Sequence, residues 1–151
     1  MGKITLLFLI FIVSQIVQAS PCLFYKEINS AMNCPKTNHF SVNYLVDYGY
    51  KYCEKFLKKE QEWNDKMSIW IHEVRECLKE KLIFRDDLSC QNVKSIGFNS
   101  HPRCYFEAGF CHLSHVQQES ILKEALGIDI LRIPYLSLKQ GVTLLVQCSR
   151  N

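Results

Sequence analysis

The chain has 151 residues, eight cysteines and a formal net charge of +3. A chain of this length typically forms one domain. Its 22% charged and 48% hydrophobic residues are those of a globular protein, which excludes wholesale disorder. The small positive charge comes without a dense run of lysine and arginine, so we expect no nucleic-acid binding.

The chain begins with the pattern of a secretory signal peptide. Lys3 gives the first residues a positive charge, and residues 4–13 form an apolar run. Small side chains that suit a cleavage site then follow, up to Ala19. A membrane anchor is the alternative, but this run is short for a bilayer span. We therefore expect residues 1–19 to be a signal peptide. Residues 20–151 should form one secreted, extracellular domain without membrane insertion.

All eight cysteines lie after the expected cleavage point. An even number of cysteines in a secreted chain predicts a disulfide framework of up to four bridges, and 105 pairings satisfy that count. A metal site is the alternative, but the chain has no Cys-x-x-Cys pair. The candidate bridge residues are Cys22, Cys34, Cys53, Cys77, Cys90, Cys104, Cys111 and Cys148.

Helical spacing is common in this sequence and strand signals are scarce. One helix is predicted from about Ser41, as its N-cap, to Lys59. The clearest amphipathic pattern runs from Met67 to Leu82, with apolar residues at i, i+3, i+4 and i+7 and charged residues on the opposite face. These patterns predict an all-α, disulfide-rich domain.

A third helix is predicted from about Ser89 to Phe98, after a turn at Asp86-Asp87. Residues 99–102 should break it, with Pro102 in the first turn of a following short helix.

Two further elements are predicted toward the end of the chain. Ser114 and Gln117 form a capping box for a helix that ends at Leu126, before Gly127. The last segment, residues 135–148, fits a helix or a strand, because its central Gly-Val-Thr weakens the helix prediction.

The sequence His101-Pro-Arg-Cys104-Tyr105 looks similar to the His-Asp-x-Cys-Tyr motif of secreted phospholipases A2. In that family the histidine is the general base and the aspartate holds calcium. Here Pro102 replaces the aspartate, and both the preceding cysteine pair and the glycine-rich calcium loop are missing. Without Ca²⁺ this chemistry loses its electrophilic stabilisation, so we expect no enzyme activity.

Two other ligand sites are weaker alternatives. His101, His112 and His115 could bind Zn²⁺, but no carboxylate with suitable spacing completes the set. Several aromatic residues could line a cavity for a hydrophobic ligand, although helical spacing is more typical of a packed core. They are Tyr44, Tyr48, Tyr52, Phe56, Trp63 and Trp70. We therefore predict no catalytic, cofactor or metal site, and keep a hydrophobic-ligand carrier as the alternative.

The cysteine intervals give a more specific signal. Cys53 lies 24 positions before Cys77, Cys90 lies 14 before Cys104, and Cys104 lies seven before Cys111. The last interval, from Cys111 to Cys148, is 37 positions. These intervals resemble those of the stanniocalcins, a family of secreted helical glycoprotein hormones. Tyr52-Cys53-Glu-Lys-Phe56-Leu57 resembles the family's Cys-x-x-Phe-Leu, and Cys104-Tyr105 its Cys-Tyr. The resemblance covers about residues 44–148.

The resemblance implies a disulfide pairing. It suggests Cys77–Cys104 and Cys111–Cys148, and leaves Cys53 and Cys90 to pair with the first two cysteines. Chain order favours Cys22–Cys53 and Cys34–Cys90, and the swapped pairing is the alternative.

The chain also departs from the family pattern. The interval from Cys77 to Cys90 is 13 positions, shorter than in the family, and only two cysteines precede Cys53. The sequence has no Asn-x-Ser/Thr glycosylation site and ends three residues after Cys148. The cysteine that links family dimers has no counterpart, so a covalent homodimer of that type is not expected.

The resemblance implies a secreted regulatory protein that acts by binding an extracellular protein, either a receptor or a protease. Stanniocalcins are implicated in calcium and phosphate homeostasis and in the inhibition of pappalysin metalloproteinases. The alternatives are a carrier of a hydrophobic ligand and a phospholipase A2-like protein.

Overall fold

The computed structural model describes residues 20–34, 43–126 and 134–150, and within these ranges it contains helices and no strand. The all-α, disulfide-rich prediction is therefore confirmed. The expected signal peptide lies outside the described residues. In chain order the helices are α1 (Phe24–Met32), a π-helix η1 (Tyr44–Tyr50), α2 (Lys51–Glu60), α3 (Asp65–Ile83), α4 (Val93–Glu107), a 3₁₀ turn η2 (Phe110–His112), α5 (His115–Leu126) and α6 (Pro134–Ser149).

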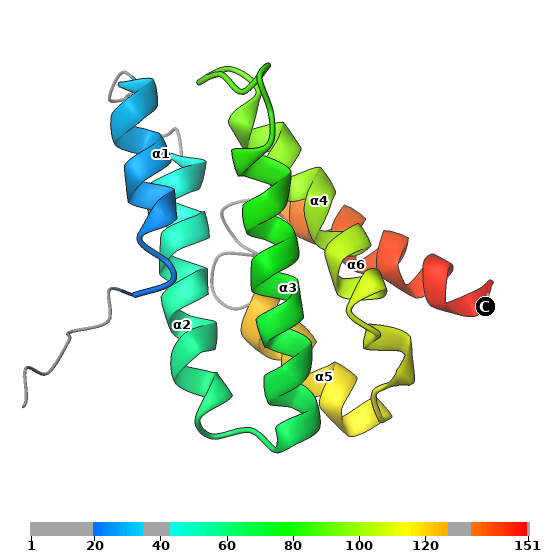
Figure 1. The fold of residues 1–151 in the computed structure, drawn as a ribbon. Helices are drawn as coiled ribbons and strands as arrows, with labels where there is room; N and C mark the ends of the chain where they lie inside the picture. Colours follow the sequence, from blue (N-terminus) through cyan, green and yellow to red (C-terminus); the bar gives the residue numbers. More distant parts are fainter. Residues whose placement is uncertain (1–19, 35–42, 127–133, 151) are drawn as a thin grey trace, which may run out of the picture.

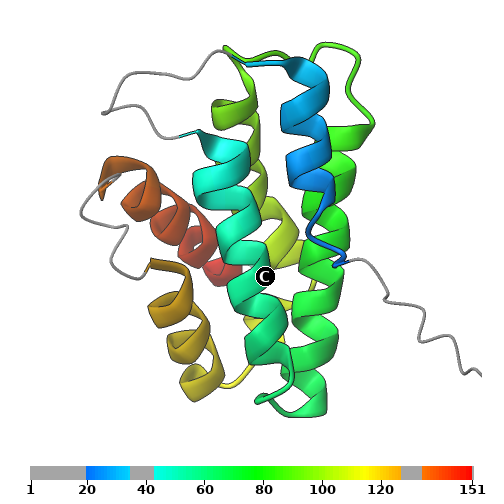
Figure 2. The same ribbon diagram turned by 90° about the vertical axis from the view of Figure 1, so that its left-hand side faces the viewer.

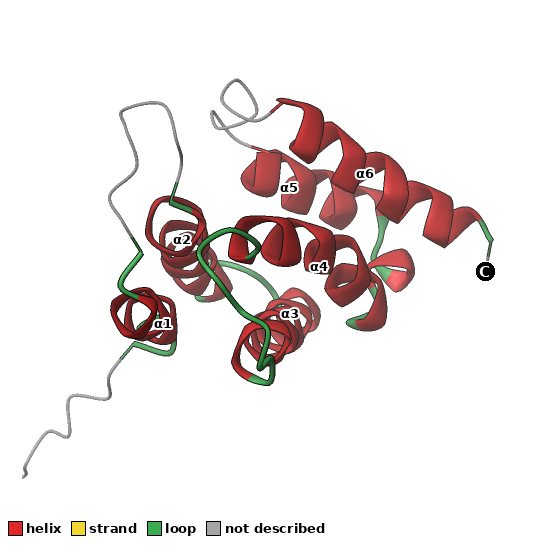
Figure 3. Cartoon of the chain, turned by 90° about the horizontal axis from the view of Figure 1, so that it is seen from above, coloured by secondary structure: helices red, strands yellow, loops and turns green. Residues whose placement is uncertain are grey.

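The helices form two groups. α1, α2 and α3 stand side by side, whereas α4, α5 and α6 lie across them (Figures 1 and 3). α4 occupies the centre, because it packs against α3 on one side and against α6 on the other. Figure 2 shows α5 beside the lower part of α2, with α6 above α5. The core therefore lies where η1, α3 and α4 meet.

The helix predicted from Ser41 to Lys59 is present as η1 followed directly by α2. Its described cap is Asn43, whose side-chain oxygen accepts hydrogen bonds from the backbone N–H groups of Leu45 and Val46, at 3.0 and 3.3 Å. Ser41, the predicted cap, lies outside the described residues. An Asn side chain serves this role well, because it satisfies backbone donors that have no partner inside the helix.

The amphipathic prediction for α3 is confirmed. The residues at its predicted apolar positions are almost all buried, and Asn64 caps the helix by accepting from the backbone N–H of Met67 at 3.2 Å. The buried residues are Met67, Trp70, Ile71, Val74, Leu78 and Leu82.

The prediction of a break before Pro102 is wrong, because α4 runs from Val93 to Glu107 with Pro102 inside it. Proline has no N–H, so the carbonyl of Phe98 lacks its usual donor four residues later. Gln140 on α6 replaces that donor, with its side-chain nitrogen 2.7 Å from the Phe98 oxygen. The hydrogen bond from α6 thus replaces the one that Pro102 cannot form, so the helix continues through the proline.

The predicted start of this helix at Ser89 is also wrong. Residues 86–87 and 90–92 form turns, and Asn92 accepts from the backbone N–H of Ser89 at 2.8 Å and donates to the carbonyl of Asp87 at 2.7 Å. These side-chain bonds compete with helical ones, so α4 begins only at Val93.

The last two helices agree with their capping signals. Ser114 accepts from the backbone N–H of Gln117 at 3.3 Å, and Gln117 accepts from that of Ser114 at 2.9 Å, which confirms the capping box of α5. Gly127 lies outside the described residues. The final segment, whose sequence fits a helix or a strand, is the helix α6.

Two glycines allow close contacts between helices. A Cβ atom on Gly97 of α4 would lie 2.0 Å from the ring of Tyr44, and one on Gly49 of η1 would lie 2.4 Å from the ring of Tyr25. Each aromatic ring therefore occupies the space that a side chain would take. Gly141 of α6 differs, because a Cβ atom added there would meet nothing within 4 Å.

We expect Gly97→Ala to destabilise the protein by about 1–3 kcal/mol, because the methyl group overlaps Tyr44 in a packed core. The matched control is Gly141→Ala, which should stabilise by about 0.5–1 kcal/mol through helix propensity alone. Guanidinium unfolding followed by circular dichroism measures both changes. Equal stability of the two variants would contradict the close contact.

The role of Gln140 can be measured with a double-mutant cycle. Gln140→Ala should cost about 1–2 kcal/mol in the native background, because it leaves the Phe98 carbonyl without a donor. In a Pro102→Ala background the cost should fall to less than half, since the substitution restores a backbone N–H for that carbonyl. Additive losses would show that Gln140 does not compensate for the proline.

Candidate functional site

Four disulfides join the described elements. They are Cys22–Cys53, Cys34–Cys90, Cys77–Cys104 and Cys111–Cys148, and no described cysteine is free. They are the same pairs as those implied by the resemblance together with chain order. The loops they close span 27 to 56 positions, for which loop-closure entropy gives about 3–4 kcal/mol each.

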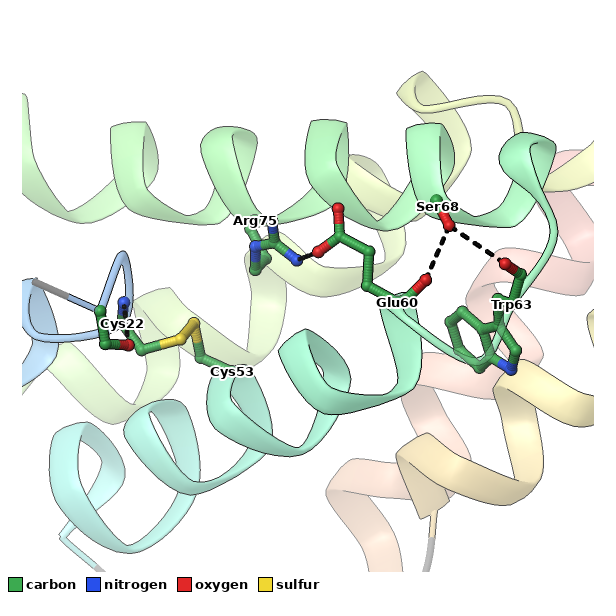
Figure 4. A network of polar contacts seen from close by, with 7 residues as sticks. Cys22, Cys53, Glu60, Trp63, Ser68 and Arg75 are labelled. Carbon is green, nitrogen blue, oxygen red and sulfur yellow. Dashed lines mark hydrogen bonds and ion pairs between the residues drawn. A yellow bond between two sulfur atoms is a disulfide. The ribbon is translucent and has the colours of Figure 1, made fainter. Parts of the chain in front are cut away.

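The first two bridges hold the helix α1 in place. The sequence patterns did not predict this helix. Cys22 precedes this helix and joins α2, and Cys34 follows it and joins the turn before α4 (Figure 4 shows the first bridge). An isolated helix of nine residues is marginal in water. The covalent links at both ends, with buried Phe24 and Tyr25, keep α1 against the other helices.

An aromatic cluster fills the centre of the molecule. The ring of Tyr48 lies 4.5 Å from that of Tyr52 and 4.6 Å from that of Phe98, measured between centroids. Burial raises the pKa of Tyr44 and Tyr105 well above the ordinary value, so both hydroxyls stay neutral. Aromatic pairs of this kind contribute about 0.5–1.5 kcal/mol each beyond the area they bury.

His101 lies inside this cluster and is 7% exposed. Its Nδ1 is 2.8 Å from the carbonyl oxygen of Gly97; since a carbonyl can only accept, Nδ1 carries the proton. Its ring centroid lies 5.8 Å from that of Tyr48 and 5.9 Å from that of Tyr105. Burial lowers the pKa of His101 from 6.5 to about 4, so the ring is neutral at physiological pH.

Arg75 on α3 forms the second buried polar feature. Its side chain is 10% exposed and forms an ion pair with Glu60 at the end of α2 (Figure 4). The backbone carbonyl of Glu60 also accepts a hydrogen bond from Ser68 at 2.9 Å. Among the described residues, Nε of Arg75 is buried without a hydrogen-bond partner. Arg75 thus joins α3 to α2 through an ion pair, and its Nε–H donor has no partner among the described residues.

A cavity of about 30 Å³ separates these two features, with Arg75 and His101 both in its wall. Tyr48, Tyr52 and Phe56 also line it, as the hydrophobic-carrier alternative would require. A water molecule needs roughly 10–15 Å³, so the space has room for one or two waters. It is too small for a lipid chain in this arrangement.

The other predicted candidates do not come together around a ligand. His112 and His115 are exposed on η2 and α5, whereas His101 is buried in α4. Within the described ranges, no group of three His, Cys, Asp or Glu residues is placed to hold a metal ion. Trp70 lies in the core, where its indole N–H is 3.4 Å from the carbonyl of Tyr105.

Arg75 is the buried polar residue that sequence reasoning missed. The helical pattern of α3 assigned it to neither face, although it comes four positions after Ile71 and directly after Val74. That position at the edge of the apolar stripe was the available signal.

Comparisons of the chain with models of protein families, with curated proteins and with solved structures give no match. In the part of the chain that the structure describes, no helix has the length and apolar content to cross a membrane. The four disulfides are consistent with an extracellular protein.

We expect the stability of the protein to fall as the pH decreases from 6.5 to 4. In this window the unfolded state binds a proton at His101 that the folded state excludes, since the folded pKa is the lower one. The total loss from this group is about 3 kcal/mol. Denaturant unfolding at a series of pH values measures it.

His101→Asn is the test variant, because its amide can donate to the Gly97 carbonyl without titrating. Its stability should depend less on pH in this window than that of the native protein. His112→Asn is the control, since it removes an exposed histidine and should keep the native dependence. An unchanged dependence in His101→Asn would contradict the buried neutral state.

Proposed function

We propose that this protein is a secreted, stanniocalcin-like regulatory protein that acts by binding another extracellular protein. The proposal extends to the two activities that the resemblance implies, in calcium and phosphate homeostasis and in the inhibition of pappalysin metalloproteinases. The target in either case is a protein surface, a receptor or a protease.

The disulfide frame is the observation that carries this proposal. Its four pairs coincide with those that the resemblance and chain order suggest. The residues of the resembling motifs also have structural roles, because Tyr52, Phe56 and Tyr105 are buried beside their cysteines. Motif and bridges therefore belong to one packing arrangement.

A cross-linked helical body suits protein recognition. Binding costs free energy when side chains and loops must be ordered, and a surface held by disulfides has lost much of that freedom before it meets a partner. Charged residues stand on the outer face of α3, including exposed Asp65, Lys66 and Glu73. Such residues favour a polar interface with electrostatic steering.

The two alternatives find less support. For a carrier, the cavity that Tyr48, Tyr52 and Phe56 line beside His101 has room for one or two waters, which is less than a lipid chain needs. Phospholipase-type catalysis needs a histidine that reaches substrate, whereas His101 is buried and its Nδ1 donates to a backbone carbonyl.

Affinity capture from extracellular fluid and from cell surfaces of the producing organism tests the proposal. We expect immobilised native protein to retain a specific partner, and we expect excess free native protein to compete for it. The control is protein reduced and alkylated at all eight cysteines, which should neither bind nor compete, because its surface is no longer held by the bridges.

A second measurement adds purified native protein to a pappalysin cleavage assay. Inhibition by native but not by reduced protein would support the protease branch of the proposal. If no partner survives competition and no cleavage is inhibited, the proposed function is wrong.

A further inference from the structure

The exposed face of α6 is unusually apolar. Nine large hydrophobic residues of the described chain are exposed, and five of them lie on this helix. They are Tyr135 (73% exposed), Leu138 (65%), Val142 (52%), Leu145 (54%) and Val146 (41%). Single exposed hydrophobic residues are ordinary, whereas a contiguous group marks an interaction site.

These five residues share one side of the helix. At about 100° per residue they fall within one sector, opposite buried Leu144 and the residues that face α4. α6 lies at the edge of the molecule, with α4 and α5 on one side of it only (Figures 1 and 3). We call these five residues the α6 stripe.

The helix is fixed with the α6 stripe facing outward. Gln140 is bonded to the carbonyl of Phe98, and Cys148 is joined to Cys111 by a disulfide. Rotation of α6 to bury the stripe would break both links. The stripe is therefore a rigid, preorganised surface.

Cations border this stripe. Lys139 is exposed and lies along one border of the stripe on the helical wheel, together with Thr143, and exposed Arg150 follows directly after the helix. The sequence of α6 contains no aspartate or glutamate. The charges that α6 itself places beside the stripe are therefore of one sign.

A surface hollow of about 100 Å³ lies at this border, between α4 and α6. Lys139, Thr143 and Asn99 line it, so an ammonium, a hydroxyl and an amide surround the same space. These groups can all donate hydrogen bonds to a phosphate oxygen.

We propose that the α6 stripe binds the surface of a membrane that contains anionic phospholipids. The apolar side chains would enter the boundary between headgroups and acyl chains, with the helix lying in the membrane plane. Lys139 and Arg150 would contact anionic headgroups, and the hollow would receive a phosphate. A second copy of the chain fits less well, because it would bring cations toward cations.

The experiment is flotation of the full secreted chain with vesicles. One set consists of phosphatidylcholine alone, and the other of phosphatidylcholine and phosphatidylserine in equal parts. We expect binding to the second set that exceeds binding to the first by at least tenfold, and that weakens as salt is added. Free inorganic phosphate should not displace the protein, because the apolar contacts require a membrane.

Two variants with matched controls separate the two parts of the site. Leu138→Ser should reduce binding about tenfold or more, whereas Ile69→Ser, at an exposed position on α3, should leave it unchanged. Lys139→Gln should reduce binding about fivefold on the anionic vesicles only, and Lys58→Gln, exposed on α2, should not. Circular dichroism checks that all four variants remain folded.

Three outcomes would overturn the proposal. The first is no binding to either set of vesicles, and the second is equal binding to both. The third is self-association in sedimentation that Leu138→Ser abolishes, because the stripe would then be covered by a second copy. Each of these can occur whether or not a protein partner exists, so the test is independent of the proposed function.

Discussion

The helices of this protein depend on covalent links between them. α1 has nine residues, too few to be stable alone, and it is bridged at both of its ends. α3 is bridged to α4, and η2 to α6. Each link joins two different elements, so it restricts the unfolded chain and also sets which helices can become neighbours. α5 contains no cysteine, and it is held by its capping box, by buried Ile121 and by the ion pair of Glu124 with Lys55.

Within that frame α4 connects the two groups of helices. Gly97 receives the ring of Tyr44, Cys104 bonds to α3, and the carbonyl of Phe98 accepts from α6. His101 lies between these contacts and is neutral, because its burial among aromatic rings lowers its pKa. All of these contacts require one continuous helix axis across Pro102. The uncharged histidine and the unbroken helix are therefore parts of the same central packing.

Much of this architecture could be read from local patterns, whereas the path of α4 across Pro102 and the burial of Arg75 depended on contacts distant in sequence. The apolar spacing of α3 and the Ser114–Gln117 capping box are local features, and both were predicted correctly. The helix across Pro102 depends on Gln140, 38 positions later, which no local rule includes. The cysteine pairs came from a resemblance, because spacing alone leaves 105 pairings. Arg75 was missed because its burial depends on Glu60, on another helix.

The order of the cysteines along the chain divides the protein into two covalent units. The sequence ranges enclosed by the bridges 22–53, 34–90 and 77–104 overlap, each with the next, whereas the range enclosed by 111–148 overlaps none of them. A single backbone cut within residues 22–104 or 111–148 leaves the pieces joined through sulfur. Between Cys22 and Cys148, only a cut between Cys104 and Cys111 releases two separate chains; Tyr105 and Phe110 in that stretch are buried, whereas Glu107 is exposed. A molecule nicked inside either unit would therefore keep its full mass until its disulfides were reduced.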